Sequence, residues 1–271
     1  MIDVSSGILS RGARVASNLA PIGRSLLAGL GAALVFGGVG SRIAMRFTAI
    51  MAGPEHLGEI TDAGATVGVI SRDGTMFLLF FGTLVSGVAG GFVYAAVRPW
   101  LPAHRAGGVF GLFALATLGS HVIEAANPDF AGFGSARANV AMFAALFVLA
   151  GITTHRLYGR LDRLHGSRVT GLLGLLAAIV LVPAIVGIVG VSTDLPGGGI
   201  PGAAALLVGV IVAALVTQVV AARRAAAPLD DVGTWMGPRL RSAGQIVGVV
   251  AAAVGAWVLA GEVAGILSAV E

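Results

Sequence analysis

Residues 25–47 read SLLAGLGAALVFGGVGSRIAMRF, a long apolar run that closes with two arginines, Arg42 and Arg46. Similar runs recur along the chain, which is 56% hydrophobic and only 11% charged. A helix needs about 20 apolar residues to cross the hydrocarbon core of a bilayer, and each run approaches that length. The sequence therefore predicts a polytopic integral membrane protein, in which residues 25–47 belong to a retained span rather than to a cleaved signal peptide.

The spans are expected to be helices. Lipid offers no hydrogen-bond partners to the backbone, so a spanning segment must be a helix or a strand of a closed barrel. Residues 170–191, TGLLGLLAAIVLVPAIVGIVGV, lack the polar and apolar alternation of a barrel strand. The predicted fold class is an all-α helical bundle with seven transmembrane helices, at residues 22–49, 75–97, 107–126, 137–155, 169–191, 202–222 and 244–267.

The polar segments between these spans are alternately rich and poor in arginine, and this pattern predicts the orientation. Basic residues near span ends mark the cytoplasmic side of a membrane protein. Placing the N-terminus in the cytoplasm puts 13 of the 17 basic residues on that side and leaves the C-terminus extracytoplasmic. These residues are Arg11, Arg14, Arg24, Arg98, Arg105, Arg156, Arg160, Arg163, Arg168, Arg223, Arg224, Arg239 and Arg241.

Composition divides the chain into two membrane halves. All 12 phenylalanines fall between Phe36 and Phe147, whereas the last three expected spans consist almost wholly of small and aliphatic residues. Residues 1–21 are expected to form a cytoplasmic segment, either an interfacial helix on anionic inner-leaflet lipids or a disordered basic tail. The expected parts that follow are a Phe-rich four-helix half at 22–155, a basic cytoplasmic loop at 156–168 and an Ala/Val/Gly-rich three-helix half at 169–271.

Four charged residues and a histidine are expected at a similar depth near the outer side. Counted from the inner ends of their spans at 1.5 Å per residue, Arg42, Arg46, His121, Glu124 and Glu262 lie about 21–32 Å along their helices. Ionisable groups in membrane spans usually face the bundle interior and pair. We therefore predict an outer-side cluster in which the two glutamates offset the arginines. The alternative is that the arginines reach outer lipid phosphates and that the acids mark helix ends.

Several chemistries find no support in the residues present. A retinal Schiff base needs a lysine, and cysteine ligands or nucleophiles need a cysteine, but the chain has neither residue. Haem held by two histidines is disfavoured because only His121 lies in an expected span, and the acidic loop at 54–75 matches no metal-binding spacing. No catalytic motif is present, so an intramembrane enzyme that uses His121 and Glu124 ranks last. We expect no cofactor, no metal and no catalytic residue.

Two functions remain. The first is a non-catalytic accessory or interaction subunit of a membrane assembly. The second is a transporter or binding protein for a small anionic solute or lipid, because paired arginines suit carboxylate or phosphate groups. The arginine-rich, lysine-free composition is typical of a GC-rich bacterium, which places the protein in the cytoplasmic membrane. Expected partners are the bilayer, anionic inner-leaflet lipids and other membrane subunits. Nucleic acid is not expected, since the arginines flank apolar runs.

Overall fold

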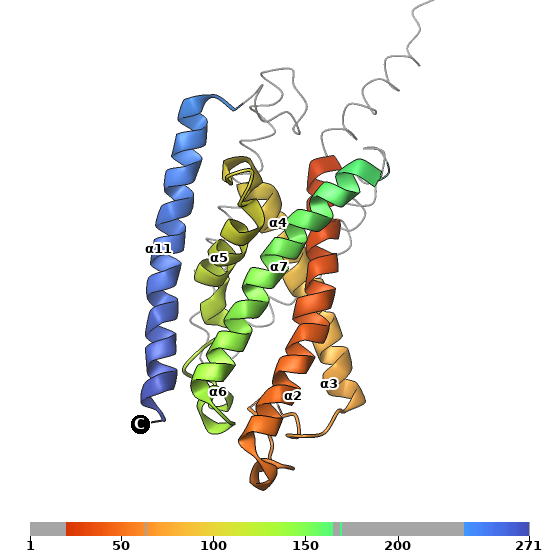
Figure 1. Ribbon diagram of the computed structural model, residues 1–271, viewed down its shortest axis with the longest axis vertical. Coiled ribbons are helices and arrows are strands. Elements are labelled where there is room, and N and C mark those ends of the chain that lie inside the picture. The colour runs from red at the N-terminus through yellow and green to blue at the C-terminus, as the bar shows by residue number, and fades with distance from the viewer. Residues whose placement is uncertain (1–19, 63, 165–168, 170–235, 271) are drawn as a thin grey trace, which may run out of the picture.

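The predicted helical architecture is present in the computed structural model, which describes residues 20–62, 64–164, 169 and 236–270 (Figure 1). Within these residues all regular structure is helical and there is no strand, apart from an isolated bridge between Ile60 and Thr66. The elements are η1 Leu34–Gly40, α2 Ser41–Ala52, η2 Pro54–His56, α3 Arg72–Phe77, η3 Leu78–Val85, α4 Ser86–Val97, η4 Arg98–Trp100, α5 Ala106–Leu118, η5 Gly119–His121, α6 Asp129–Gly132, α7 Ala136–Leu164 and α11 Pro238–Ser268.

Four helical segments are long and apolar enough to cross a membrane: Ala20–Ala52, Arg72–Trp100, Ala136–Arg163 and Pro238–Ser268. They correspond to the first, second, fourth and seventh expected spans. The third expected span, 107–126, is shorter than predicted, because the apolar helix runs only from Ala106 to His121. The fifth and sixth expected spans lie outside the described residues, except for residue 169, as do residues 1–19.

The bundle has two chemically different ends. One end carries α6, the end of α2 and the C-terminal end of α11, together with residues 53–71 that connect α2 to α3 (Figure 1). We call it the loop end. The opposite end carries the end of α7 and the beginning of α11, and we call it the basic end. Here α7 continues helically to Leu164, well beyond residue 155, where the fourth span was expected to end.

Glycine allows α5 and α7 to pack backbone against backbone. A Cβ atom added at Gly111 of α5 would lie 2.7 Å from the Cα and carbonyl oxygen of Val148 on α7. One added at Gly107 would lie 2.9 Å from the Cα of Ile152. Lipid tails are as apolar as side chains, so helices in membranes associate through close van der Waals contact, which small residues permit. The Gly107 and Gly111 pair is therefore part of a helix crossing within the bundle.

Two π-helical segments face each other where the first and second long helices cross. At the centre of this crossing, Gly37 of η1 and Gly82 of η3 are so close that a Cβ atom on either would overlap the carbonyl oxygen of the other. A π-helical turn bonds residue i to residue i+5 and is wider than an α-helical turn. The crossing joins the helix that leads into α2 to the helix that follows α3. It therefore joins the same two helices that are connected by residues 53–71 at the loop end.

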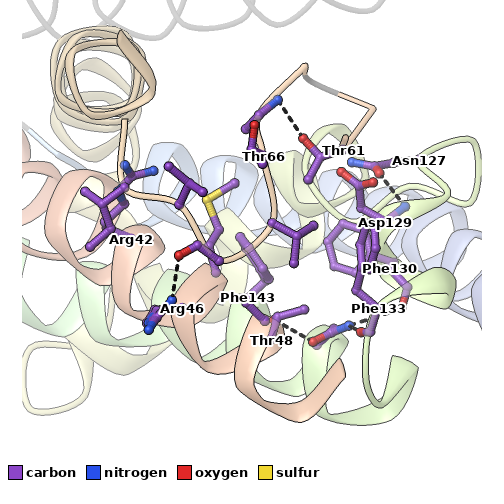
Figure 2. A pocket seen from close by; sticks show the side chains of 18 residues that line it. Arg42, Arg46, Thr48, Thr61, Thr66, Asn127, Asp129, Phe130, Phe133 and Phe143 are labelled. Atoms are coloured by element: carbon purple, nitrogen blue, oxygen red, sulfur yellow. Dashed lines mark hydrogen bonds between the residues drawn. The ribbon is translucent and has the colours of Figure 1, made fainter. Parts of the chain in front are cut away.

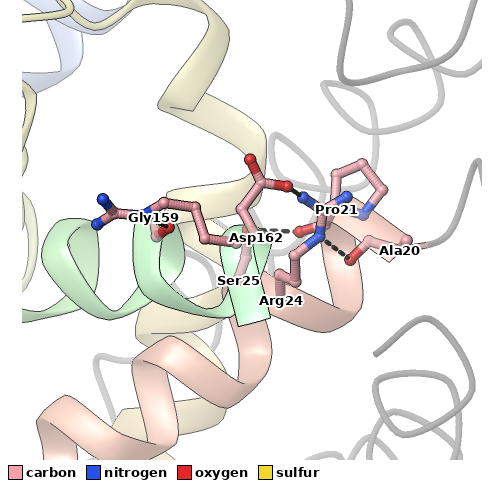
Figure 3. Close-up of polar contacts among 7 residues, drawn as sticks. Ala20, Pro21, Arg24, Ser25, Gly159 and Asp162 are labelled. Atoms are coloured by element: carbon pink, nitrogen blue, oxygen red, sulfur yellow. Dashed lines mark hydrogen bonds and ion pairs between the residues drawn. The ribbon is translucent and has the colours of Figure 1, made fainter. Parts of the chain in front are cut away.

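An ion pair ties the first helix to α7 at the basic end. The guanidinium of Arg24 pairs with the carboxylate of Asp162, and its Nε donates to the carbonyl of Ala20 at 3.3 Å (Figure 3). Arg24 is only 3% exposed, whereas Asp162 is half exposed. The ring of Tyr158 lies 5.5 Å from the Arg24 guanidinium carbon and 4.3 Å from that of Arg98. These cation–π contacts join three helices around one buried aromatic ring.

A second aromatic contact completes this end of the core. The hydroxyl of Tyr94, which is fully buried, lies 2.7 Å from Nδ1 of His155. The two tyrosines of the chain, Tyr94 and Tyr158, also contact each other edge to face, with ring centroids 5.7 Å apart. Buried tyrosine hydroxyls need a hydrogen-bond partner, and the imidazole supplies it. The polar groups at the basic end therefore hold the helices together.

The glycine crossing between α5 and α7 predicts a sharp difference between neighbouring positions. Gly111→Val should destabilise the protein by about 1–3 kcal/mol, because the new side chain must displace the α7 backbone. Thermal unfolding of the detergent-purified protein measures this. Gly108→Val is the matched control, since nothing lies within 4 Å of a Cβ atom at Gly108 on the same helix. Equal unfolding temperatures for the two variants would contradict the crossing.

The ion pair at the basic end makes a second prediction. Asp162→Asn should lower stability by about 1–3 kcal/mol, because it removes the carboxylate that pairs with the buried guanidinium of Arg24. The control is Asp73→Asn, which removes an exposed carboxylate at the loop end. In a thermal unfolding cycle, Asp162→Asn should have much less effect when Arg24→Met is already present. Additive effects of the two substitutions would show that the residues do not interact.

Candidate functional site

The connection between α2 and α3 folds into a compact turn over the loop end. Gly53 ends α2 with a φ of 93°, a backbone conformation that glycine adopts without strain. Beyond it the backbone of Val67 donates to Glu59 at 2.8 Å, and Thr61 donates to Ala65 at 2.8 Å. These bonds fold residues 53–62 and 64–71 back on themselves. We call this segment the lid loop.

Both arginines of α2 bind the lid loop. Nη2 of Arg42 donates to the carbonyl of Ser71 at 3.2 Å and to the hydroxyl of Thr75 at 3.0 Å. Nη1 of Arg46 donates to the carbonyl of Gly68 at 2.9 Å (Figure 2). The arginines therefore hold the C-terminal part of the lid loop and the first turn of α3 against α2. All of their assigned acceptors are uncharged.

The other side of the lid loop is held by α6. The backbone N–H of Asp62 lies 3.1 and 3.3 Å from the two carboxylate oxygens of Asp129. The ring of His56 packs edge to face against Phe133, with centroids 5.7 Å apart, and its Nδ1 lies 3.1 Å from a carboxylate oxygen of Glu59. The lid loop is thus attached to α2 on one side and to α6 on the other.

A cavity of about 150 Å³ lies beneath the lid loop. Figure 2 shows Arg42 and Arg46 on one side of it and Asp129 on the other, with phenylalanines between and around them. Most of the other lining residues are apolar or are threonines, and many come from the lid loop itself. The residues that give the cavity its chemical character are Arg42, Arg46, Asp129, Phe130, Phe133 and Phe143.

A buried asparagine fixes the aromatic part of the cavity wall. Asn139 of α7 is 2% exposed, and its amide donates to the carbonyls of Phe130 and Phe133 at 3.2 and 2.8 Å. Its oxygen accepts a hydrogen bond from the Thr48 hydroxyl at 2.7 Å. The amide therefore connects α2, α6 and α7. Sequence analysis did not single out this residue, although an amide at the start of an apolar span is the signal that points to it.

The other predicted cluster residues lie at the same end of the bundle but not around the cavity. His121 ends η5 and is exposed, and Glu124 follows it in the connection to α6. Glu262 of α11 accepts a hydrogen bond from the backbone of Ala125 at 2.7 Å, so it attaches α11 to that connection. Within the described residues no ion pair joins Arg42 or Arg46 to either glutamate.

The expected pairing of arginine with glutamate is therefore replaced by pairing with the lid loop. The physical reason is that the lid loop brings backbone carbonyls directly over α2, whereas Glu262 is engaged by a backbone N–H elsewhere. Arg42 still has an unused donor, because its Nε is buried and has no hydrogen-bond partner among the described residues. Buried donors of this kind are uncommon in folded proteins.

No family model, no characterised protein and no solved structure matches this chain. Its function therefore has to follow from the geometry of the cavity. In the part of the chain that the structure describes, no group of three or more acidic, histidine or cysteine residues could hold a metal ion. The groups that a ligand could contact in the cavity are two guanidinium groups, one carboxylate and an aromatic wall.

The surroundings of Asp129 disfavour the charged form of its carboxyl group. Partial burial raises the pKa of its carboxyl above the ordinary value, the hydrogen bond from the Asp62 backbone lowers it, and the nearby Asp62 carboxylate raises it further. The net effect is a raised pKa, so the charged form of Asp129 is disfavoured in the folded protein. Its contribution to stability is therefore greatest in acid and is lost as the pH rises through the raised pKa.

The raised pKa of Asp129 predicts that the effect of Asp129→Asn on stability depends on pH. At pH 7 the variant should unfold at a higher temperature than the wild type, because it lacks the disfavoured charge yet keeps an acceptor for Asp62. The difference should shrink as the pH falls toward the ordinary carboxyl value of 3.8. Thermal unfolding at several pH values measures it, with Asp73→Asn as the control. A difference that grows on acidification would contradict the raised pKa.

Proposed function

We propose that the protein is a non-catalytic multi-pass membrane protein that binds a small anionic solute or an anionic lipid headgroup in the cavity beneath the lid loop. The observation that supports this is that both α2 arginines reach one cavity and donate to neutral oxygens. A hydrogen bond to an ionised acceptor contributes about 1.5–3 kcal/mol, against about 0.5–1.5 kcal/mol for a neutral one. A carboxylate or phosphate would therefore compete well for these guanidinium groups.

The charge balance of the cavity favours an anion as well. Two arginines line it, and Asp129 is the one carboxylate among the described lining residues. That carboxylate already accepts hydrogen bonds from the lid loop, so it is not positioned to neutralise the arginines. The cavity thus has a net positive charge in a partly apolar setting, where Coulomb attraction is stronger than in water.

We further propose seven spans, a cytoplasmic N-terminus and an extracytoplasmic C-terminus in a bacterial cytoplasmic membrane. The alternation of arginine-rich and arginine-poor segments supports this orientation. It makes the basic end cytoplasmic, where its arginines would meet anionic inner-leaflet lipids, and it makes the loop end extracytoplasmic. The anion would then enter the cavity from the outer side of the membrane.

The role of accessory subunit in a membrane assembly stays a prediction. α11 lies at the side of the bundle and exposes apolar residues along its length, including Trp257 at 82% exposure (Figure 1). Lipid and a neighbouring transmembrane helix would both cover such a surface. Native mass spectrometry after gentle extraction tests this role, because co-purifying membrane subunits would support it and an isolated chain would oppose it.

The anion-binding proposal predicts a specific effect of the two arginines. Arg42→Gln and Arg46→Gln should each weaken anion binding about tenfold or more, because each removes a charge-assisted hydrogen bond. Calorimetric titration of the full chain in zwitterionic nanodiscs with acetate and with inorganic phosphate tests a free solute. Native mass spectrometry of retained phosphatidylglycerol tests a lipid headgroup.

Arg137→Gln is the matched control, because Arg137 is an exposed arginine at the start of α7 and does not line the cavity. The unfolding temperature of each variant reports whether the lid loop remains folded. Unchanged affinity for all three probes in both cavity variants would remove the proposal. An equal loss in Arg137→Gln would show that binding reflects general surface charge.

A further inference from the structure

We infer, building on the proposed anion-binding function, that the cavity takes a compact monocarboxylate whose apolar body is about the size of a six-carbon ring. Aromatic carboxylates and short-chain fatty acids belong to this class. The inference rests on four features of the cavity: its volume, its wall, its net charge and the two guanidinium groups of α2.

The volume limits the apolar body of the ligand. A cavity of about 150 Å³ is enough for one benzene-sized group, the size that an engineered apolar cavity of that volume is known to bind. Two acyl chains would not fit in it. A single inorganic anion would leave most of the apolar wall without contact, so the space suits a ligand with both a charge and a small carbon body.

The wall between the charged groups is aromatic. Phe130 and Phe143 pack edge to face with centroids 5.3 Å apart, and Phe133 is positioned beside them by the amide of Asn139. Aromatic rings attract one another in edge-to-face and offset arrangements. Figure 2 places Phe130 and Phe133 on the side away from Arg42 and Arg46, with Phe143 between, so a ligand whose charge meets α2 directs its carbon body toward α6 and α7.

The net charge selects a monoanion. Arg42 and Arg46 supply two positive charges and Asp129 one negative charge, so a ligand with a single negative charge leaves the cavity neutral. A dianion of the same size would bring its second charge toward Asp129, and like charges at short range repel. Several other ionisable groups of this region do not line the cavity: Glu55, His56, Glu59 and Asp62 of the lid loop, Arg72 and Asp73 of α3, Arg137 of α7 and Glu262 of α11.

The donors at α2 suit a carboxylate. Arg42 uses its Nη2 for the lid loop and the Thr75 hydroxyl, and its buried Nε has no hydrogen-bond partner among the described residues. A carboxylate has two oxygens that match adjacent guanidinium N–H groups. A carboxylate that bonds to Arg42 or Arg46 gains a charge-assisted hydrogen bond, which a neutral ligand of the same size does not provide.

Four probes of related shape test this class by calorimetric titration of the full chain in zwitterionic nanodiscs. Benzoate should bind at least about tenfold more tightly than acetate, because each buried methylene-sized group strengthens binding about fourfold before ordering costs. Benzoate should also bind at least about tenfold more tightly than the neutral benzyl alcohol and the dianion phthalate. Arg42→Gln should weaken benzoate binding and have little effect on benzyl alcohol.

Two substitutions test separately how the aromatic wall and the charge of Asp129 contribute to ligand affinity. Phe143→Leu should weaken benzoate several-fold and leave acetate unchanged, with Phe47→Leu as the control, because Phe47 is an exposed phenylalanine of α2 outside the cavity. Asp129→Asn should raise phthalate affinity more than benzoate affinity. Unfolding temperatures confirm that each variant is folded, and the wild-type comparison of the four probes does not depend on any variant.

The outcomes distinguish this inference from the proposed function. If acetate and benzoate bind equally and both require Arg42, the carbon-body inference fails and anion binding stands. If phthalate binds as tightly as benzoate, the monoanion inference fails. If benzyl alcohol binds as tightly as benzoate, or if benzoate does not bind, the inference fails, and the acetate, phosphate and phosphatidylglycerol probes then decide the proposed function separately.

Discussion

Two guanidinium groups near the end of an apolar helix must have hydrogen-bond acceptors, and the architecture of the loop end follows from which acceptors they use. Arg42 and Arg46 bind the lid loop and the first turn of α3 rather than a carboxylate. These bonds position α3 beside α2 and hold the lid loop above the bundle. They also leave a cavity between the lid loop, α6 and α7, so the site exists because the arginines are bonded to backbone.

The arginines at the two ends of the bundle have different kinds of partner. At the basic end Arg24 has a carboxylate partner and an aromatic ring against it, so its charge is neutralised within the protein. At the loop end the acceptors of Arg42 and Arg46 are neutral oxygens, so a positive charge remains available. This contrast separates a structural arginine from one that can bind an anion, although all three lie on the same helical segment, residues 20–52.

The helical class and four of the spans could be predicted from the sequence, because apolar run length and charge content alone determine them. The early end of the third span could not, since α5 ends at Leu118 and is followed by the 3₁₀ turn Gly119–His121, which composition does not encode. The acceptors of Arg42 could not be predicted either, because backbone carbonyls carry no signature in the sequence. Glu262 lies at the loop end, as the two arginines do, but its partner there is the backbone of Ala125, which sequence patterns do not reveal.

The facing π-helical segments change how the faces of the first helix relate to one another. An α-helix advances about 100° per residue, whereas the wider turns of η1 hold more residues for the same rotation. The segment therefore rotates α2 about the helix axis relative to residues 20–33. A helical wheel drawn from residue 20 with about 100° per residue would assign Arg42 and Arg46 to the wrong face of the helix. The direction in which Arg42 and Arg46 point toward the lid loop therefore depends on the number of residues in Leu34–Gly40 as much as on which residues these are.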